Sequence, residues 1–175
     1  MNRKFIFAAV LAFLSGSLTL ALTAQESPDG FREALRLMDR GYSSRASSLF
    51  SLQDDVNAEG YDILCHVRMR TVGYEAPMHR FLKENPHSAV VPRIRYAYAL
   101  NLFDEGKFQE AADIFESINI AHLDSDHKTE YLFKKAYSHL ENHNLEDAVE
   151  GFEQVEKQPM NDYTAPSRYI LGSTV

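Results

Sequence analysis

Between Pro92 and Phe115, the stretch PRIRYAYALNLFDEGKFQEAADIF carries two runs of apolar positions separated by a short polar break. From Ile94 to Phe103 the apolar residues fall on nearly every side of a helix, which predicts a helix that is covered from several directions. The polar break DEG follows, and then a shorter run with apolar residues on one side. The pattern predicts two helices joined by a tight turn. The apolar positions of the second helix are Phe108, Ala111, Ala112, Ile114 and Phe115.

Four positions of this stretch have a mechanical role in a helical hairpin. Gly106 can adopt the left-handed conformation that ends the first helix. Phe108 packs at the start of the second helix, and Ala111 lets the two helices approach closely. Phe115 lies one turn further on, and its burial contributes roughly 1.5–3 kcal/mol. This order and spacing of residues resembles the core of a tetratricopeptide repeat (TPR).

Three further segments carry the same order of turn residue, small residue and aromatic residue. They are GYSSRASSLF with Gly41, Ala46 and Phe50; GYEAPMHRFL with Gly73, Tyr74, Pro77 at the alanine position and Phe81; and NLEDAVEGFEQV with Leu145, Ala148 and Phe152, preceded by His143 in place of the glycine. The aromatic anchors stand 31, 34 and 37 residues apart, around the 34-residue period of the TPR family. Small residues also recur midway along the first helices, at Ala34, Cys65, Ala99 and Ala136.

The resemblance implies an all-α, TPR-like solenoid of antiparallel helix pairs. It covers four repeats, at about 28–53, 58–86, 92–120 and 128–158, and the start of a fifth from 164. No stretch alternates as a strand would. Caps, prolines and glycines predict where the helices begin and end. The predicted helices are Pro28 to Asp39, Ser43 to Leu52, Ala58 to Arg70, Ala76 to Lys83, Pro92 to Gly106, Phe108 to Ile118, Lys128 to Glu141, Leu145 to Glu156, and a last one that begins near Ser167.

Residues 1–24 are predicted to be a signal peptide rather than part of the fold. Two basic residues precede an apolar run, and small residues follow near a cleavage site. Cleavage is expected after Ala24, with Ala21 as the alternative. An uncleaved membrane anchor stays open, because residues 5–22 are just long enough to span a bilayer. The repeat domain, 25–175, is therefore expected to be periplasmic or otherwise exported.

Charge and cysteine content narrow the classes of partner. Two of the chain's 18 Lys and Arg lie in the signal segment, and none of its 25 Asp and Glu do. Such an acidic domain is a poor candidate for nucleic acid, because that binding depends on Lys and Arg that neutralise phosphates. A membrane contact is expected only through the N-terminal segment. Cys65 is the only cysteine, so no internal disulfide can form, and its position predicts a buried small residue rather than a reactive thiol.

Candidate chemistry is sparse. His139 and His143 have a spacing that can chelate a metal, but no third ligand is evident beyond Glu141 and Glu146. The loop at 122–127 is rich in ligand-type side chains and lacks the glycine and closing glutamate of a calcium loop, so it is expected to be a connector that caps the next helix. No phosphate loop, nucleophile elbow or zinc-protease helix is present. We therefore expect no enzyme, no metal and no cofactor.

The resemblance also implies a place for binding, because the first helices of TPR arrays line a concave groove. In the later repeats the groove positions are Tyr96, Leu100, Phe103, Phe133, Tyr137 and Leu140, and in the earlier repeats they are Phe31, Leu35, Met38, Asp62, His66 and Met69. Chaperone-binding members of the family hold a C-terminal carboxylate there with lysines and asparagines, which this chain lacks at those positions. An apolar groove suits an amphipathic helix or an extended peptide. The alternative is that these side chains pack between neighbouring first helices.

The expected function is that of an exported TPR scaffold that mediates protein–protein interaction in the cell envelope, with another protein or peptide as partner. A small-ligand or glycan-binding module, with the ligand stacked on Tyr96, Phe133 and Tyr137, is the competing interpretation. The final helix, with apolar residues at 169–171, has no partner helix in the sequence. This favours an N-terminal module of a longer TPR protein over a docking surface at this end.

Overall fold

The computed structural model describes residues 28–174, and in this range the chain is helical without any strand. The expectation of an all-α protein is therefore confirmed. The predicted signal peptide, residues 1–24, lies outside the described residues. The helices are α1 (Pro28–Asp39), α2 (Ser43–Phe50), α3 (Val56–Met69), α4 (Glu75–Glu84), α5 (Val91–Asp104), α6 (Phe108–Glu116), the short 3-10 helix η1 (Ile120–His122), α7 (Ser125–Glu141), α8 (Leu145–Glu156) and α9 (Thr164–Thr174).

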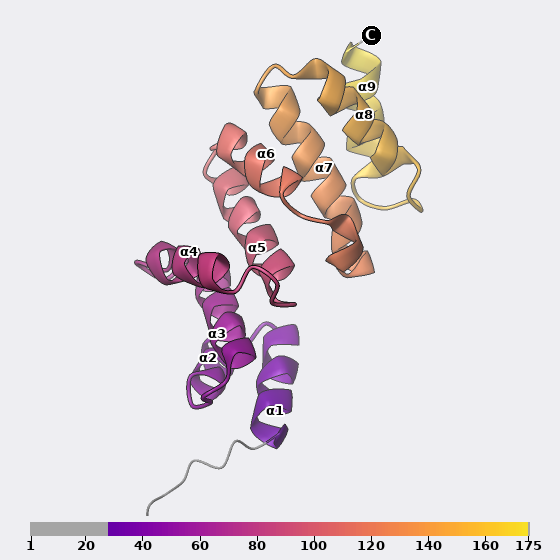
Figure 1. Ribbon diagram of the computed structural model, residues 1–175. Coiled ribbons are helices and arrows are strands. Elements are labelled where there is room, and N and C mark those ends of the chain that lie inside the picture. The colour runs from indigo at the N-terminus through magenta and orange to yellow at the C-terminus, as the bar shows by residue number, and fades with distance from the viewer. Residues whose placement is uncertain (1–27, 175) are drawn as a thin grey trace, which may run out of the picture.

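The helices follow one another in space in the order of the sequence, with α1 and α9 near opposite ends of an elongated body (Figure 1). Within each pair the two helices pack together, as α1 does with α2, α5 with α6, and α7 with α8. Adjacent pairs are joined by contacts of α2 with α3, α3 with α5, α6 with α7, and α8 with α9. Packing is therefore between near neighbours along the chain, and each helix pair supports the next.

The first helix of every pair ends in the same way. The first or second residue after it has a positive φ, of 83° at Gly41, 52° at Arg70, 73° at Gly106 and 60° at His143. Its N–H donates to the carbonyl three residues back, and the next N–H donates to the carbonyl five residues back. This is the Schellman motif, which satisfies carbonyls that a helix end leaves unpaired. The four helix pairs thus share one turn geometry.

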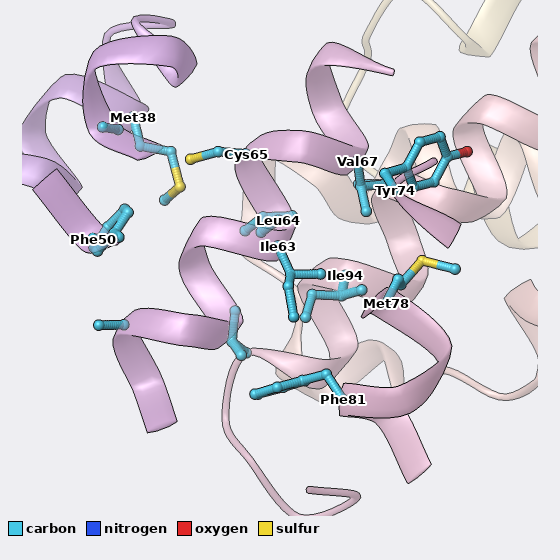
Figure 2. Packing of buried hydrophobic residues seen from close by; sticks show 14 of the residues in the cluster. Met38, Phe50, Ile63, Leu64, Cys65, Val67, Tyr74, Met78, Phe81 and Ile94 are labelled. Carbon is cyan, nitrogen blue, oxygen red and sulfur yellow. The ribbon is translucent and has the colours of Figure 1, made fainter. Parts of the chain in front are cut away.

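The second helices bury their aromatic anchors completely. Phe50, Phe81 and Phe115 are 0% exposed and Phe152 is 1% exposed, and they are the largest fully buried side chains. The small residues midway along the first helices are also buried: Ala34, Cys65, Ala99 and Ala136. Figure 2 shows the core of the first half, where Cys65 lies beside Met38 and Ile94 lies near Ile63 and Met78. The anchors and small residues expected from the sequence are confirmed as core residues.

Cys65 is a packing residue. It is fully buried, and burial raises the pKa of its thiol to about 11, so the reactive thiolate is scarce at neutral pH. The expectation that Cys65 is buried is confirmed.

The second pair departs from the expected phase. The sequence assigned its turn to Gly73, whereas α3 ends at Arg70, which adopts the left-handed conformation and makes both Schellman hydrogen bonds. Gly73 follows in a longer connection, also with a positive φ of 79°. Pro77, expected at the alanine position, is only half-buried, and Met78 beside it is fully buried.

The last helix, α9, packs on α8, and its apolar residues are partly exposed and partly buried. The side chain of Tyr169 is 79% exposed, whereas Ile170 and Leu171 are half-buried against the core around Ala136 and Phe152. Met160, in the connection before α9, is 86% exposed. Among the helices of residues 28–174, none is long and apolar enough to cross a bilayer.

Candidate functional site

A cavity of about 530 Å³ lies across the first helices of the first four pairs. Helix α5 lines it with one face, since the contributing residues follow each other at spacings of three and four. We call this cavity the first-helix pocket. From α5 it is lined by Arg93, Tyr96, Ala97, Leu100, Asn101 and Asp104; from the α1–α2 corner by Met38, Asp39, Gly41 and Ser43; from the end of α3 by Arg68 and Arg70; and from α7 and the residues before it by Leu123, Asp124, His127 and Glu130.

A chain of polar contacts crosses the pocket from α3 to α7. Arg70 donates through Nη2 to Asp104, and the Nζ of Lys134 lies 3.7 Å from the other oxygen of Asp104. The same Nζ lies 3.2 Å from Oε1 of Glu130. The hydroxyl of Tyr96 donates to Oε2 of Glu130 over 2.8 Å. These contacts tie α3, α5 and α7 together on the pocket side.

The guanidinium of Arg70 is held from behind by a buried amide. Its Nε donates to Oδ1 of Asn101 over 2.9 Å. Asn101 is 4% exposed, and its Nδ2 donates to the carbonyl of Val67 (2.9 Å) and to the hydroxyl of Tyr74 (3.3 Å). A buried amide with partners at both of its ends has little freedom to turn. Asn101 therefore fixes where the guanidinium of Arg70 lies.

At the other end of the pocket, Arg93 donates to both carboxylate oxygens of Asp124. Its Nη2 lies 3.2 and 3.3 Å from the two oxygens of Asp124. Asp124 occupies the N-cap position of α7 but makes no side-chain capping hydrogen bond. The loop at 122–127 was expected to cap this helix, but the carboxylate of Asp124 accepts hydrogen bonds from Arg93 instead.

Two of the six predicted groove residues, Tyr96 and Leu100, line the first-helix pocket. Tyr96 is only 6% exposed, and its ring contacts His127 and Phe115 at centroid distances of 5.5 and 6.5 Å. Burial, reinforced by the charge and hydrogen bond of Glu130, raises the pKa of Tyr96 far above its usual range. Tyr96 thus contributes to the floor of the pocket mainly as a core residue.

The other four predicted groove residues do not line this pocket. Phe103 packs edge-on against Phe108 and Tyr137, with centroids 5.4 and 5.7 Å apart. Phe133 stacks on Tyr137 at 6.1 Å and also contacts Tyr163 at 5.0 Å. Leu140 is half-buried in the adjoining core of α7 and α8. These rings contact one another, which is the packing arrangement that the sequence left open as the alternative.

The groove positions predicted for the earlier repeats also separate. Of these, only Met38 lines the first-helix pocket. Asp62 and His66 lie in a different hollow of about 380 Å³, together with residues from the start of α4. The phase expected for the second pair therefore does not place these two residues in one groove with Tyr96.

Ser47, Asp62 and His66 resemble a catalytic triad in composition but not in geometry. The hydroxyl of Ser47 donates to Asp62 and lies 3.4 Å from Nε2 of His66. Nδ1 of His66, which would face the carboxylate in a triad, contacts the hydroxyl of Thr71 at 3.0 Å. The serine proton is directed to the acid and not to the imidazole, so the arrangement does not activate a nucleophile.

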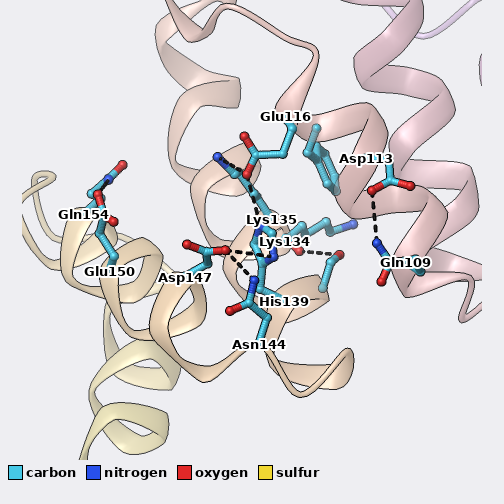
Figure 3. A network of polar contacts seen from close by, with 12 residues as sticks. Gln109, Asp113, Glu116, Lys134, Lys135, His139, Asn144, Asp147, Glu150 and Gln154 are labelled. Carbon is cyan, nitrogen blue, oxygen red and sulfur yellow. Dashed lines mark hydrogen bonds and ion pairs between the residues drawn. The ribbon is translucent and has the colours of Figure 1, made fainter.

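His139 and His143 do not share a site. Nε2 of His139 lies 3.1 Å from Glu116, which also pairs with Lys135 at 2.9 Å, and the ring faces Asp147 on its other side (Figure 3). His143 is exposed at the turn after α7. Within residues 28–174, no group of three or more His, Cys, Asp or Glu side chains is arranged to hold a metal ion.

Sequence reasoning missed the charged residues of the pocket. Arg93 and Asp104 lie on the same face of α5 as Tyr96 and Leu100, at spacings that the helix period could have revealed. Arg70 could not have been found in this way, because its place depends on the turn after α3.

Comparisons with protein-family models, with curated proteins and with solved structures found no match to this chain.

Proposed function

We propose that this chain is an exported TPR-type scaffold that binds a segment of another protein in the cell envelope. The observation that carries the proposal is the recurrence of one helix-pair plan: a left-handed residue after the first helix and a fully buried phenylalanine in the second. Repeats of this kind stack into superhelices whose faces serve as extended binding surfaces. The apolar N-terminal segment supports export.

The first-helix pocket is the proposed binding site. Its lining comes from four successive first helices or the turns beside them, so a segment lying there would touch several repeats at once. The floor is apolar, with Ala97, Leu100 and Leu123, and the rim is charged. An apolar floor suits an anchoring side chain, and a polar rim suits the backbone and neighbours of an extended peptide.

A small ligand is the second candidate, because a volume of about 530 Å³ falls within the ordinary range of small-molecule pockets. Stacking of a glycan on Tyr96, Phe133 and Tyr137 is not favoured. Their rings contact neighbouring rings, and Tyr96 is nearly fully buried. A small ligand would have to use the floor and rim of the pocket instead.

The binding proposal can be tested with a displayed random-peptide library and a metabolite and glycan panel, each presented to the purified protein. Selected peptides should lose binding when Leu100→Ala or Arg93→Gln alters the pocket. Leu49→Ala is the matched control, since Leu49 is a half-buried leucine outside the pocket. Enrichment of no peptide, or peptides that bind Leu100→Ala and Arg93→Gln unchanged, would reject the peptide site.

Export has its own test. Expressed in a Gram-negative host, the protein should be recovered from the periplasmic fraction with a new N-terminus at Gln25, or at Leu22 after the alternative cleavage. Recovery of the protein with an intact Met1 in the membrane fraction would show that the N-terminal segment is an uncleaved anchor and not a cleaved signal peptide. Reading the genomic frame beyond Val175 would decide whether the chain is the N-terminal module of a longer TPR protein.

A further inference from the structure

We infer that the end of the first-helix pocket formed by Arg68 and Arg70 binds carboxylate side chains, and that the segment held in the pocket is acidic. The inference rests on the proposed peptide-binding function and names the chemistry of the peptide. It comes from three observations: the backbone of Arg70, the partners of the pocket's arginines, and the partners of its carboxylates.

Arg70 occupies a backbone position that favours glycine. Its φ is 52°, and two of the three equivalent turn positions in the other pairs carry glycine. A left-handed conformation costs a residue with a side chain about 1–2 kcal/mol relative to its right-handed form. Strain of this kind clusters at functional sites, and its contacts with Asn101 and Asp104 distinguish Arg70 from the exposed His143, which has the same conformation. Here the side chain reaches into the pocket, and the buried Asn101 holds its Nε.

The pocket's arginines have hydrogen-bond donors to spare. A guanidinium carries five N–H donors. Arg70 uses Nε for Asn101 and Nη2 for Asp104, and its Nη1 has no acceptor among the described residues. Arg68 lines the same end of the pocket and makes no hydrogen bond or ion pair within residues 28–174. Two guanidiniums at one end of the pocket therefore present free N–H groups.

The pocket's carboxylates are mostly occupied. Asp104 has Arg70 and Lys134 as partners, Glu130 has Lys134 and the Tyr96 hydroxyl, and Asp124 has Arg93. The exception is Asp39, which forms no ion pair with another described residue. The formal charges of the lining residues nearly cancel. The groups that a ligand can bind are therefore those that have no partner within the protein. The ligand meets more free donors than free acceptors, which favours a ligand rich in carboxylate oxygens.

Geometry favours side-chain carboxylates flanking an apolar residue. The apolar floor of Ala97 and Leu100 lies on α5 between Arg93 at one end of the stripe and Asp104, the partner of Arg70, at the other. An apolar side chain on this floor would place its neighbours along the peptide near the arginine-lined ends. Exposed arginine–carboxylate pairs contribute little stability, so an incoming carboxylate can share Arg70 with Asp104 at small cost.

The test uses three fluorescent peptides that differ only in charge: acetyl-Gly-Glu-Leu-Glu-Gly-amide and its counterparts with Gln or Lys in place of Glu. Fluorescence anisotropy with the purified protein should show the Glu peptide binding at least about tenfold more tightly than the Gln peptide, as expected for one charge-assisted hydrogen-bonded contact. The Lys peptide should bind more weakly still. The affinity of the Glu peptide should fall with added salt.

Variants locate the contact. Arg68→Gln should weaken the Glu peptide about tenfold and leave the Gln peptide unchanged, because Arg68 makes no contact that the fold requires. Arg70→Lys keeps the charge and removes the planar fork, and it should also weaken the Glu peptide. Arg36→Gln is the matched control, since Arg36 is an exposed arginine on α1 outside the pocket. Circular dichroism confirms that each variant is folded.

The outcomes separate this inference from the proposed function. If the Gln or Lys peptide binds as tightly as the Glu peptide and Leu100→Ala abolishes that binding, the peptide site stands and its acidic preference is rejected. If Arg68→Gln leaves the Glu peptide unchanged, the carboxylate contact is rejected. If inorganic phosphate competes fully at low concentration while all three peptides bind equally, the arginines form a general anion site and the inference is wrong. If the displayed library also yields no binder, the peptide function itself fails.

Discussion

The pair α5–α6 and the pair α3–α4 have the same turn motif and the same buried phenylalanine, yet they are packed differently. In α6, Ala111 lies one turn before Phe115 and is fully buried, and α5 and α6 pack along most of their length. In α4 the residue at this position is Pro77, with Met78 beside it in the core. There α3 and α4 pack along much less of their length than the helices of the other pairs.

The difference shows what the alanine position does. Without a side chain beyond Cβ, alanine lets two helix backbones approach, and a methionine at the interface holds them apart. Tyr98 of α5 contacts Tyr74 at the start of α4 and His79 within it through edge-on ring packing. No ion pair joins α4 to another described helix, whereas Glu116 ties α6 to α7 and Glu156 ties α8 to α9. We expect α4 to be the most easily displaced of the second helices.

The largest expected effect compares two emptied phenylalanine sites. Phe115→Ala should lower the free energy of unfolding by about 3–5 kcal/mol, because α5 and α6 pack closely and cannot move to fill the space that the ring leaves. Phe81→Ala should cost less, since α4 can shift to fill part of the space that the ring leaves. Urea unfolding followed by circular dichroism gives both values. A larger loss at Phe81 would mean that α4 is held as firmly as α6.

A second pair of variants adds one methyl group at each interface. A Cβ at Gly151 in α8 would lie 2.6 Å from Cβ and 3.2 Å from Cα of Ala136, which cannot move without the α7 backbone. Gly151→Ala should therefore destabilise by about 1–3 kcal/mol. At Gly60 in α3 the obstructing atoms belong to the side chains of Val90 and Phe81. Gly60→Ala should cost less because both obstructing groups are side chains rather than backbone, and Phe81 can move with α4. Equal thermal shifts for the two variants would contradict this.

A third comparison concerns the two turns that have a side chain in the left-handed position. His143→Gly should stabilise the protein by about 0.5–1 kcal/mol, because it removes backbone strain and the exposed imidazole makes no hydrogen bond or ion pair with another described residue. Arg70→Gly should not stabilise it, because the contacts with Asn101 and Asp104 are lost at the same time. Thermal unfolding of the two variants measures the difference. Equal stabilisation would show that the side chain of Arg70 contributes nothing to the fold.

Much of the helical framework could be predicted from the sequence, because helix ends carry local signals. Proline at the start and a left-handed glycine after the end placed α1 at the residues observed, and Pro159 just beyond Glu156 marked where α8 ends. The second turn was misplaced for a physical reason. Glycine is the usual signal for a left-handed turn, so the sequence favoured Gly73 over Arg70. The side chain of Arg70 is held by Asn101, 31 residues further along the chain, which local sequence does not reveal.

The candidate site was less predictable, because it depends on which side chains contact each other across helices. Tyr96 and Leu100 were placed by the helix period and do line the pocket. Phe103 and Tyr137 were expected in the same groove, but each ring packs against the other. An aromatic residue on a helix face has the same local sequence whether it meets a ligand or a neighbouring ring. Only the packing of α5 on α7 distinguishes the two.

The smallest expected effect is a pH dependence of stability at the corner where α6, α7 and α8 meet. Helix α4 has no comparable ion pairs among the described residues. Desolvation raises the pKa of Glu116, but hydrogen bonds and charges from Lys135 and His139 outweigh it and leave the pKa below its usual value (Figure 3). A carboxylate with a lowered pKa in the folded protein stabilises it above the unfolded pKa of about 4.3, and this contribution is lost as the pH falls through the folded value. Glu116 is half-exposed, so the effect should be small.

Between pH 6 and pH 3.5, the melting temperature of the unmodified protein should therefore fall more than that of Glu116→Gln, by about 1–2 °C. Glu153→Gln is the matched control, because Glu153 is an exposed glutamate in α8 whose side chain has no ion-pair partner among the described residues. Hydrogen exchange at pH 3.5 should increase for the amides of α6 relative to pH 6 after correction for the intrinsic rate, and change little for those of α4. If Glu116→Gln and the unmodified protein lose stability in parallel, the ion pairs of Glu116 do not hold α6 against α7. The weaker attachment of α4 would then follow from its missing alanine alone.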